Sequence, residues 1–321
     1  MFYLKEISYT FDINEYNFIK SIPADENEYT NDFYDISMED YVSKALPYFK
    51  DSHEGKNLKE GYVPETFFLL INDDRIIGQV RIRHYLTKEL AETSGHIGYY
   101  IAPEFRGKGF GKNCLRLAIT YAYQFVKEDE IYLRALKTNT ASIKVQLANG
   151  GKIHHEDEKH TYVRIIKQPV SHEFAMQIAL DEAYNGIGNG DGGPFGSVIT
   201  KGNRIIGRGH NRVLKNGDPT CHGEMEAIRD ACRNLKTHDL TGCELYTTAE
   251  PCPMCLGGIL WSNISKVYYG CTVDDTNEIG FRDGKFYDFL KGDKNLLDLE
   301  NFHRNDCLSL FKEYEKRKHL Y

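Results

Sequence analysis

The chain has 321 residues, about twice the length of a typical domain, so we expect two domains that each bury a core. Hydrophobic residues make up 41% of the sequence and charged residues 27%, which excludes a disordered or fibrous protein, and no segment has the ~18 apolar residues of a membrane helix. The net charge of -7 disfavours a protein that coats a polyanion. Because the N-terminus lacks a basic flank followed by an apolar run, we expect a cytoplasmic protein with no membrane partner.

The first half of the chain predicts a mixed α/β domain. Its apolar runs indicate two strands joined by the turn at residues 72–75, then a third strand, a helix and a fourth strand. In chain order these elements are strands 66–71, 76–82 and 98–101, helix 115–126 and strand 131–135. The residues before 65 carry no informative pattern.

A glycine-rich turn, Arg106-Gly107-Lys108-Gly109-Phe110-Gly111, separates the third strand from the helix. A helix N-terminus behind such a turn offers unpaired N–H groups and a favourable dipole to a phosphate. The turn is neither the Gly-x-Gly-x-x-Gly of dinucleotide-binding folds nor the Gly-Lys-Ser/Thr of the P-loop.

This turn resembles the Arg/Gln-x-x-Gly-x-Gly/Ala turn of the GNAT acetyltransferases, whose backbone amides hold the pyrophosphate of acetyl-CoA. The similarity spans roughly residues 65–160 and includes Asn139-Thr-Ala-Ser142 and Asn149-Gly-Gly151. It implies a GNAT-like mixed-sheet domain that uses acetyl-CoA and an unknown amine acceptor. The implied acetyl-CoA contacts are Ile101, Arg106, Gly107, Lys108, Gly109, Phe110, Gly111, Asn139 and Ser142.

The resemblance leaves the chemistry of the first half open. Many GNAT enzymes have a tyrosine about one turn beyond the position of Asn139 that protonates the departing thiolate, but this chain has Val145 and Gln146 there. Neither a general acid nor a general base is assigned. The domain is interpreted either as a working acyltransferase or as a module that only binds CoA or has lost activity.

The polar stretch Lys167-Gln-Pro-Val170 follows a strand-like segment and precedes a helical one. We place a domain boundary there, which gives domains 1–167 and 168–321. So short a link predicts that the two domains lie close together.

The second half of the chain alternates helices with strands. The pattern predicts helix 171–186, a hairpin of strands 195–200 and 204–208, helix 222–235, strand 244–248, helix 253–261, strand 266–270 and a helix near 305–318. Such alternation favours an α/β sandwich, here a three-layer α/β/α domain.

Three residues of the second half form a candidate zinc site: His222, Cys252 and Cys255. Zinc held by three protein ligands, with a fourth position left for water, is the catalytic pattern, and imidazole and thiolate are ligands that zinc prefers. Two cysteines three residues apart at the start of a helix lie on one face, where the helix dipole favours the thiolate.

Glu224 lies two residues after the histidine, close enough to reach the same pocket and transfer protons from a zinc-activated water. A lone Cys-x-x-Cys is more often structural or redox-active, and a lone His-x-Glu means little. Together, as His-x-Glu followed after about 30 residues by Pro-Cys-x-x-Cys, they match the signature of zinc-dependent base deaminases. The other six cysteines we interpret as buried thiols.

Nearly all of the second half resembles the cytidine deaminase superfamily and, more narrowly, its bacterial guanine deaminases. The resemblance rests on Gly192-Gly-Pro-Phe-Gly196, Gly209-His-Asn211, Asp218-Pro-Thr-Cys-His-Gly-Glu224, the segment 248–261 and Glu278-Ile-Gly-Phe-Arg-Asp283. It implies conversion of guanine to xanthine and ammonia, in which zinc-activated water attacks C2 and Glu224 moves protons to the leaving amine.

The same resemblance implies a set of substrate contacts. Asn211 and Phe195 match residues that hydrogen-bond and stack the base, Trp261 matches a wall of the pocket, and Asp283 matches a carboxylate that reads the guanine edge. A carboxylate suits guanine, whose adjacent N1–H and 2-amino groups are both donors. In that family the C-terminal segment is exchanged within a homodimer, and a terminal tyrosine, here Tyr321, closes the partner's pocket.

Alternatives remain open for the substrate. A tRNA adenosine deaminase shares the zinc pattern, but it needs a basic surface, whereas acidic residues slightly outnumber basic ones from residue 168 onward, so we expect no nucleic-acid partner. Gly223 stands where alanine is common in the family, a departure that we expect to change little but that leaves open a shift in substrate toward a nucleoside such as guanosine. A non-catalytic regulator that binds CoA and a purine is disfavoured by the intact zinc set with Glu224.

Overall fold

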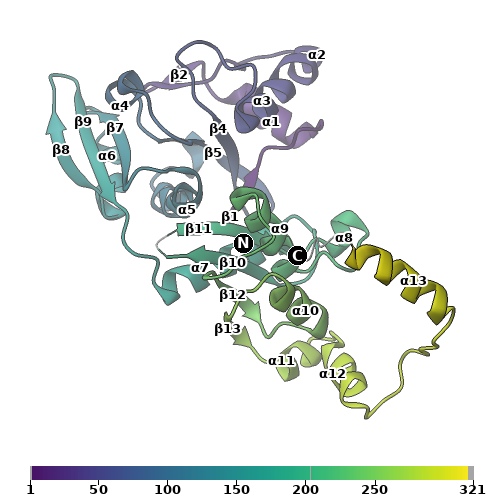
Figure 1. The fold of residues 1–321 in the computed structure, drawn as a ribbon. Coiled ribbons are helices and arrows are strands. Elements are labelled where there is room, and N and C mark those ends of the chain that lie inside the picture. Colours follow the sequence, from purple (N-terminus) through teal and green to yellow (C-terminus); the bar gives the residue numbers. More distant parts are fainter. Residues whose placement is uncertain (1, 203, 317–321) are drawn as a thin grey trace. The chain divides into compact units, whose positions relative to one another are not determined.

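The computed structural model describes residues 2–202 and 204–316 (Figure 1). The chain divides into two compact units, Met1–Thr272 and Val273–Tyr321. The first unit contains the whole of the first half and the second half as far as its last strand. The second unit contains the C-terminal helices.

The first half contains an antiparallel four-stranded sheet. Its order is β1-β4-β5-β6, and its strands are β1 (Phe2–Glu6), β4 (Glu65–Asn72), β5 (Arg75–Arg83) and β6 (Ile97–Ile101). The three strands predicted for this sheet are confirmed. Strand β4 is buried along nearly its whole length, which explains its continuous apolar run, whereas β1 comes from the segment that carried no informative pattern.

A second sheet of the first half has the order β7-β9-β8, with strands β7 (Glu130–Leu136), β9 (His160–Ile166) and β8 (Lys152–Glu156). It is joined to the first sheet through His96, the residue before β6, whose amide donates to the Tyr132 carbonyl over 2.7 Å and whose Nδ1 accepts from the Tyr132 amide over 2.9 Å. Beyond this point β6 and β7 belong to different sheets. The opening between them holds a cavity described below.

Helices and a short hairpin complete the first half. They are α1 (Ile13–Ser21), the hairpin β2 (Asp25–Glu26) and β3 (Tyr29–Thr30), α2 (Met38–Asp40), the π-helix η1 (Tyr41–Ala45), α3 (Leu46–Glu54), α4 (Lys88–Thr93), the 3₁₀ turn η2 (Pro103–Phe105), α5 (Phe110–Phe125) and α6 (Thr140–Ala148). Helix α5 begins five residues before the predicted start, because Gly109 in the left-handed conformation caps it directly after the glycine-rich turn.

The second half has a four-stranded sheet of order β11-β10-β12-β13, in which β12 and β13 are parallel. Its strands and helices are α7 (His172–Gly188), β10 (Gly196–Lys201), β11 (Arg204–His210), α8 (Val213–Asn216), α9 (Gly223–Leu235), β12 (Glu244–Ala249), α10 (Pro253–Trp261) and β13 (Lys266–Cys271). All of the elements predicted for this region are present, with ends that differ by no more than two residues.

Side chains of this sheet alternate between two cores. Val198, Ile205 and Tyr246 pack in one core with Ile178 of α7. Their neighbours in sequence pack in another core with residues of α9 and α10, namely Ile199, Ile206 and Leu245. Because successive residues of a strand point to opposite faces, helix α7 covers one face of the sheet and α9 and α10 cover the other. The predicted three-layer α/β/α arrangement is confirmed.

Helix α5 of the first half contacts the second half directly. Arg116 makes two hydrogen bonds of 3.0 and 3.2 Å with Asp181 of α7, and the guanidinium of Arg208 in β11 lies 3.7 Å from the centre of the Tyr121 ring. Residues of both halves also belong to one apolar core, which runs from Leu115 of α5 to the residues of α7. The prediction that the two halves lie close together is therefore confirmed by contacts between their side chains.

The C-terminal unit contains α11 (Val273–Glu278), α12 (Asp283–Lys291) and α13 (Arg304–Glu315), the last of which matches the predicted C-terminal helix. No helix within the described residues is long and apolar enough to cross a membrane.

The cysteines outside the zinc motif are only partly buried. Those at 114, 221 and 243 are buried as predicted and Cys232 is half-buried. The prediction is wrong for Cys271 and Cys307, which are exposed. Cys271 ends the edge strand β13 and Cys307 lies on α13, whose residues are almost all exposed, so neither position has a core to enter.

Candidate functional site

The zinc motif comes together at the N-terminal ends of two helices. His222 is the N-cap residue of α9, and Cys252 is the N-cap residue of α10, with Cys255 in the first turn of the same helix. The ligand atoms of these three residues lie within 4.8 Å of one another. Two helix N-termini therefore point at one small volume, where their dipoles favour thiolates.

The distances within this cluster suit tetrahedral zinc. The His222 Nδ1 atom lies 3.5 Å from Cys252 Sγ and 3.6 Å from Cys255 Sγ. Zinc bonds of about 2.0–2.1 Å to nitrogen and about 2.3 Å to sulfur, at tetrahedral angles, place these atoms roughly 3.6 Å apart. The three residues therefore fit a zinc ion that has one further coordination position.

Glu224 lies beside the cluster and is only 5% exposed. Its Oε2 is 3.4 Å from Cys255 Sγ, and its Oε1 accepts a hydrogen bond of 3.1 Å from Thr247 Oγ1. Thr247 in turn accepts a bond of 3.0 Å from Ser197 Oγ. The carboxylate is thus held toward the cluster by a chain of two buried hydroxyls on β12 and β10.

The two thiols of the cluster and the neighbouring Glu224 carboxyl have shifted pKa values. A hydrogen bond from Cys255 is the main factor that lowers the pKa of the Cys252 thiol to about 4, with a further contribution from His222. The same hydrogen bond, together with burial, raises the pKa of Cys255. Burial also raises the pKa of Glu224. A carboxyl group with a raised pKa is suited to take up and release protons.

Two of the predicted base-binding residues lie next to the cluster. The Asn211 amide donates to the Phe195 carbonyl over 2.8 Å, and Asn211 Oδ1 accepts a bond of 3.2 Å from the Val213 amide. The Nδ2 group of Asn211 is therefore the part that could donate to a bound base. Phe195 is half-buried at the start of β10, beside the N-terminus of α9.

Gly223 explains how closely Phe195 approaches the helix that carries the histidine. A Cβ atom at position 223 would lie 2.9 Å from the backbone oxygen of Phe195 and 3.2 Å from its carbonyl carbon. An alanine here would push the start of β10 away from α9. The glycine thus allows the backbone at Phe195 to lie this close to the start of α9.

The remaining predicted substrate contacts stay predictions. Trp261 ends α10 and is 74% exposed, so the described residues of this chain do not enclose it in a pocket wall. Asp283 is the first residue of α12 and belongs to the C-terminal unit. Tyr321 lies outside the described residues.

The glycine-rich turn has the shape of a phosphate cradle. Gly107 and Gly109 have φ values of 76° and 82°, a region that favours glycine, and nothing lies within 4 Å of a Cβ built on either. Helix α5 starts directly after Gly109, and its first N–H groups have no partner within the helix. Side chains at these positions would fill the space in front of those groups, so the site fits the pyrophosphate of acetyl-CoA.

Three side chains predicted around this turn are engaged within the protein. The Arg106 guanidinium donates to the Ile101 carbonyl over 2.8 Å and makes two bonds of 2.6 and 3.0 Å with Glu26. Lys108 Nζ donates to a carbonyl of the 3₁₀ turn η2 over 2.9 Å, and the Phe110 ring stacks on an aromatic ring of β1. The backbone of the turn is therefore the part that can contact a phosphate directly.

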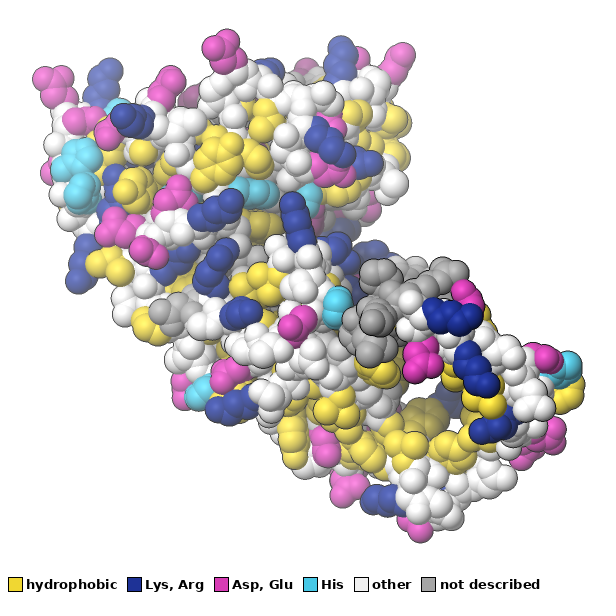
Figure 2. Space-filling model, in the orientation of Figure 1, with side chains coloured by type: hydrophobic (Ala, Val, Ile, Leu, Met, Phe, Trp, Pro, Cys, Tyr) yellow, Lys and Arg dark blue, Asp and Glu magenta, His cyan; other side chains and the backbone are white. Residues whose placement is uncertain are grey.

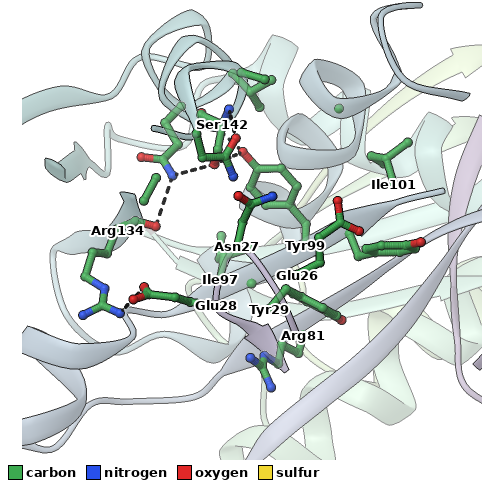
Figure 3. A pocket seen from close by; sticks show the side chains of 18 of the residues that line it. Glu26, Asn27, Glu28, Tyr29, Arg81, Ile97, Tyr99, Ile101, Arg134 and Ser142 are labelled. Atoms are coloured by element: carbon green, nitrogen blue, oxygen red, sulfur yellow. Dashed lines mark hydrogen bonds and ion pairs between the residues drawn. The ribbon is translucent and has the colours of Figure 1, made fainter. Parts of the chain in front are cut away.

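A cavity of about 470 Å³ extends from this turn into the opening between β6 and β7. Asn139 caps α6, its Oδ1 accepting from the Ser142 amide over 3.1 Å. The Ser142 hydroxyl is 2.8 Å from the Tyr99 hydroxyl, and the two side chains point toward one another within the cavity (Figure 3). Gln146 Nε2 also donates to Ser142 Oγ over 3.2 Å.

Sequence analysis did not single out Thr247 or Tyr99. Thr247 reaches Glu224 through the pairing of β10 with β12, and Tyr99 reaches Ser142 across the opening between the sheets. Tyr99 lies in a strand that was predicted correctly, but its partner is 43 residues away in sequence. No local pattern marks such a contact.

The comparison with known proteins identifies both halves. Residues 169–271 match the model of the cytidine and deoxycytidylate deaminase zinc-binding region, and residues 30–147 match the acetyltransferase (GNAT) family. The guanine deaminase of Bacillus subtilis (strain 168) is 45% identical over 118 residues, which are 37% of this chain and 76% of that protein. The chain belongs to the cytidine and deoxycytidylate deaminase family.

Relatives of the deaminase domain include enzymes that act on different substrates. The tRNA-specific adenosine deaminase of Aquifex aeolicus (strain VF5) is also 45% identical, over 97 residues that are 30% of this chain and 64% of that protein. The X-ray structure of guanine deaminase from Bacillus subtilis is 38% identical, with a TM-score of 0.45, over 47% of this chain and 99% of that one. Sequence identity alone therefore leaves the base open. The domain boundary predicted after residue 167 lies between the two family matches and stays a prediction.

Proposed function

We propose that the deaminase domain converts guanine to xanthine and ammonia with a bound zinc ion. The observation that carries the proposal is the cluster of His222, Cys252 and Cys255, whose nitrogen–sulfur distances suit tetrahedral zinc, with the buried carboxylate of Glu224 beside it. A zinc ion held there would bind a water molecule and lower its pKa.

The residues of the chain carry the proton transfers. Glu224 takes a proton from the water as the water attacks C2 of guanine, and it delivers protons to the departing amine. Burial raises the pKa of Glu224, which suits a group that must both accept and donate. Thr247 keeps the carboxylate oriented through its hydrogen bond to Oε1.

Guanine is favoured over the other bases by the contacts inferred from the sequence. Asn211 donates to the base, Phe195 stacks on it and Trp261 lines the pocket, while Asp283 accepts hydrogen bonds from N1–H and the 2-amino group. Adenine and cytosine lack that adjacent pair of donors and would donate fewer hydrogen bonds to the carboxylate. We further expect a cytoplasmic homodimer in which Tyr321 closes the partner's pocket, and light scattering of the purified protein tests the dimer.

Deamination of a tRNA adenosine is the alternative, because relatives with that activity are as similar in sequence. Such an enzyme needs a surface that attracts phosphates. On the face shown in Figure 2, acidic side chains are interspersed with the basic ones, and the chain carries a net charge of -7. These charges support a small-molecule substrate.

For the first half we propose transfer of an acetyl group from acetyl-CoA to an amine. The backbone of Gly107 and Gly109 and the N-terminus of α5 hold the pyrophosphate, and the cavity between β6 and β7 holds the thioester end. The hydroxyl of Tyr99 is the group that could protonate the departing thiolate, in place of the tyrosine that the family has near position 145. Replacing Tyr99 with Phe should therefore lower turnover more than acetyl-CoA affinity, as measured by thiol release and calorimetry.

The test of the deaminase proposal is ammonia release by the zinc-loaded protein from guanine, guanosine, adenine, cytosine and an unmodified tRNA. We expect turnover with guanine that is lost in Glu224→Gln and reduced in Asp283→Asn. Turnover confined to tRNA or guanosine would show that the pocket has been assigned to the wrong base. No turnover with any substrate, although zinc is bound, would support a binding protein.

A further inference from the structure

A second cavity of about 520 Å³ adjoins the acetyl-CoA cavity. Its walls come from the hairpin β2–β3, the segment before β4, the strands β4 and β5, and α4. The two cavities share six lining residues: Glu28, Arg81, Arg83, Thr93, Ser94 and Arg134. The two cavities are therefore adjacent, and these residues form the boundary between the thioester end of the proposed cofactor site and the second cavity.

Carboxylates dominate the charge of the second cavity. Its lining includes the acidic residues Asp25, Glu28, Asp32, Glu60, Glu65 and Glu89, and the basic residues Arg81, Arg83 and Arg134. Two of the arginines are already paired, Arg83 with Glu65 at 3.6 Å and Arg134 with Glu28 at 2.5 Å. The excess of negative charge in a partly enclosed space favours a cationic ligand and disfavours an anionic one.

Glu28 lies where the two cavities meet, at the tip of the hairpin β2–β3 (Figure 3). Its φ of 67° is unusual for a residue that is not glycine and costs conformational energy. The carboxylate is held by Arg134 and by His160 Nε2 at 3.0 Å. The hairpin is thus fixed with an acidic side chain at the junction, which is where an acceptor must meet the thioester.

Glu65 supplies a second acidic group at the start of β4, and it is only 3% exposed. Its Oε1 accepts a bond of 3.2 Å from the Tyr48 hydroxyl. Its Oε2 is buried and accepts no hydrogen bond from any described residue, since Arg83 Nε at 3.6 Å is too far. A buried carboxylate oxygen without a donor is costly, and it calls for a functional reason such as a ligand that donates to it.

Aromatic residues form the rest of this wall. Phe33, Tyr48, Phe49, Tyr62 and Phe67 line the same cavity as the carboxylates. Their rings provide apolar surface for an alkyl chain and faces that attract cations. Acidic groups separated by apolar surface suit a molecule in which ammonium groups are joined by methylene chains.

From these observations we infer that the second cavity is the acceptor site of the acetyltransferase domain and that it takes a small primary amine with at least one further positive charge, of the diamine or polyamine class. The inference rests on the acetyl transfer proposed above. The distal ammonium group binds Glu65, and the reacting amine lies at the junction near Glu28.

The transfer itself is a balanced exchange. The reacting ammonium first gives a proton to solvent, and the nitrogen lone pair then forms a bond to the acetyl carbonyl carbon. The carbon–sulfur bond breaks, the thiolate takes up a proton, and the acetylated nitrogen loses its extra proton. The products are an N-acetylated amine, free CoA and one net proton.

The test compares acceptors of different charge with the full-length protein. Release of CoA from acetyl-CoA is measured with spermidine, putrescine, the singly charged aromatic amine tyramine, and the anionic acceptors aspartate and a uridine-diphosphate amino sugar. Acetyl-CoA binding is measured separately by calorimetry. We expect the highest kcat/KM with spermidine or putrescine, and a preference for an anionic acceptor would overturn the inference.

Variants of the cavity locate the binding site. Glu65→Gln keeps the shape but removes the charge, and it should raise the dissociation constant for spermidine about 10- to 100-fold without changing that for acetyl-CoA. The control variant is Glu158→Gln, which removes an exposed carboxylate from the turn between β8 and β9. It should change neither the dissociation constant for spermidine nor that for acetyl-CoA. If Glu65→Gln does not fold, the exposed pair Asp32→Asn and Glu60→Gln should still weaken spermidine binding several-fold.

Calorimetry separates the two proposals. Spermidine binding that depends on Glu65, without CoA release, would support the site and refute acetyl transfer. CoA release that is unaffected by the cavity variants would support acetyl transfer and refute this acceptor site. Spermidine binding of equal strength in wild type, Glu65→Gln and the Asp32/Glu60 variant would also refute the site.

Discussion

Replacing Thr247 with Val tests how Glu224 is held in the deaminase site. Valine has nearly the shape of threonine, but it lacks the hydroxyl that donates to Glu224 Oε1 over 3.1 Å. A hydrogen bond to a charged group contributes about 1.5–3 kcal/mol, which corresponds to a loss of about 10- to 150-fold in kcat if the bond acts in the transition state. Because Thr247 bonds Glu224 and not a member of the metal cluster, the zinc content should stay the same.

The neighbouring residue provides a matched control. Thr248 is also buried on β12, but its hydroxyl accepts from the Gly196 amide over 3.1 Å and donates to the Pro194 carbonyl over 3.2 Å. Thr248→Val therefore removes a comparable pair of bonds without touching the carboxylate. Initial rates of ammonia release, zinc content and melting temperature are compared for both variants. Wild-type kcat in Thr247→Val, or an equal loss in Thr248→Val, would refute the role given to Thr247.

Three further predictions concern the packing around the two domains. Arg208→Met should lower the free energy of unfolding by about 3 kcal/mol, because it leaves the buried Glu182 carboxylate without its arginine, and an unchanged urea midpoint would contradict this. Burial raises the pKa of Glu182, but Arg208 and His210 outweigh this effect and lower the pKa to about 2. The ionised Glu182 therefore stabilises the fold fully above its unfolded pKa near 4.5, and this stabilisation is lost as the pH falls toward 2. Glu182→Gln should therefore flatten the acid limb of the plot of melting temperature against pH, and an unchanged slope would contradict the shift. Gly223→Ala should raise KM for guanine several-fold with zinc retained, because its Cβ displaces Phe195; a normal KM would show that the start of β10 can move without consequence.

The contact between the domains links the two sites through one helix. Helix α5 begins at the glycine-rich turn, and residues further along it reach the deaminase domain, where Gln124 donates to Asp230 over 3.0 Å. Tyr121 donates to Glu182, which also binds His210, the residue before Asn211. The fusion is therefore a shared structural unit up to residue 272 and not two domains on a flexible tether.

Much of the deaminase fold could be predicted because its pattern is local. Paired apolar residues such as Ile205 and Ile206 mark strands covered on both faces, and helix α9 is long and amphipathic. The first 64 residues were less informative for a physical reason. Their helices are short, and the hairpin β2–β3 turns at Asn27 and Glu28 with positive φ values, without the glycine that marks a tight turn most clearly.

The candidate metal site could be predicted because three of its residues stand at helix starts. Pro253 and the spacing of the two cysteines fix the geometry of α10, and the His-x-Glu pair does the same for α9. Contacts that depend on strand pairing, such as the one from Thr247 to Glu224, leave no trace in local sequence. The acidic second cavity could not be predicted either, since Glu28, Glu65 and Glu89 come together only through the fold.

The most direct test of the account is the product formed from guanine in water enriched in ¹⁸O. The zinc-loaded protein should release ammonia and form xanthine that carries a single ¹⁸O atom at C2, and removal of zinc with a chelator or the Glu224→Gln substitution should abolish both. Unchanged guanine in the presence of bound zinc, together with inosine formed in a tRNA substrate, would contradict the assignment of the deaminase domain to guanine.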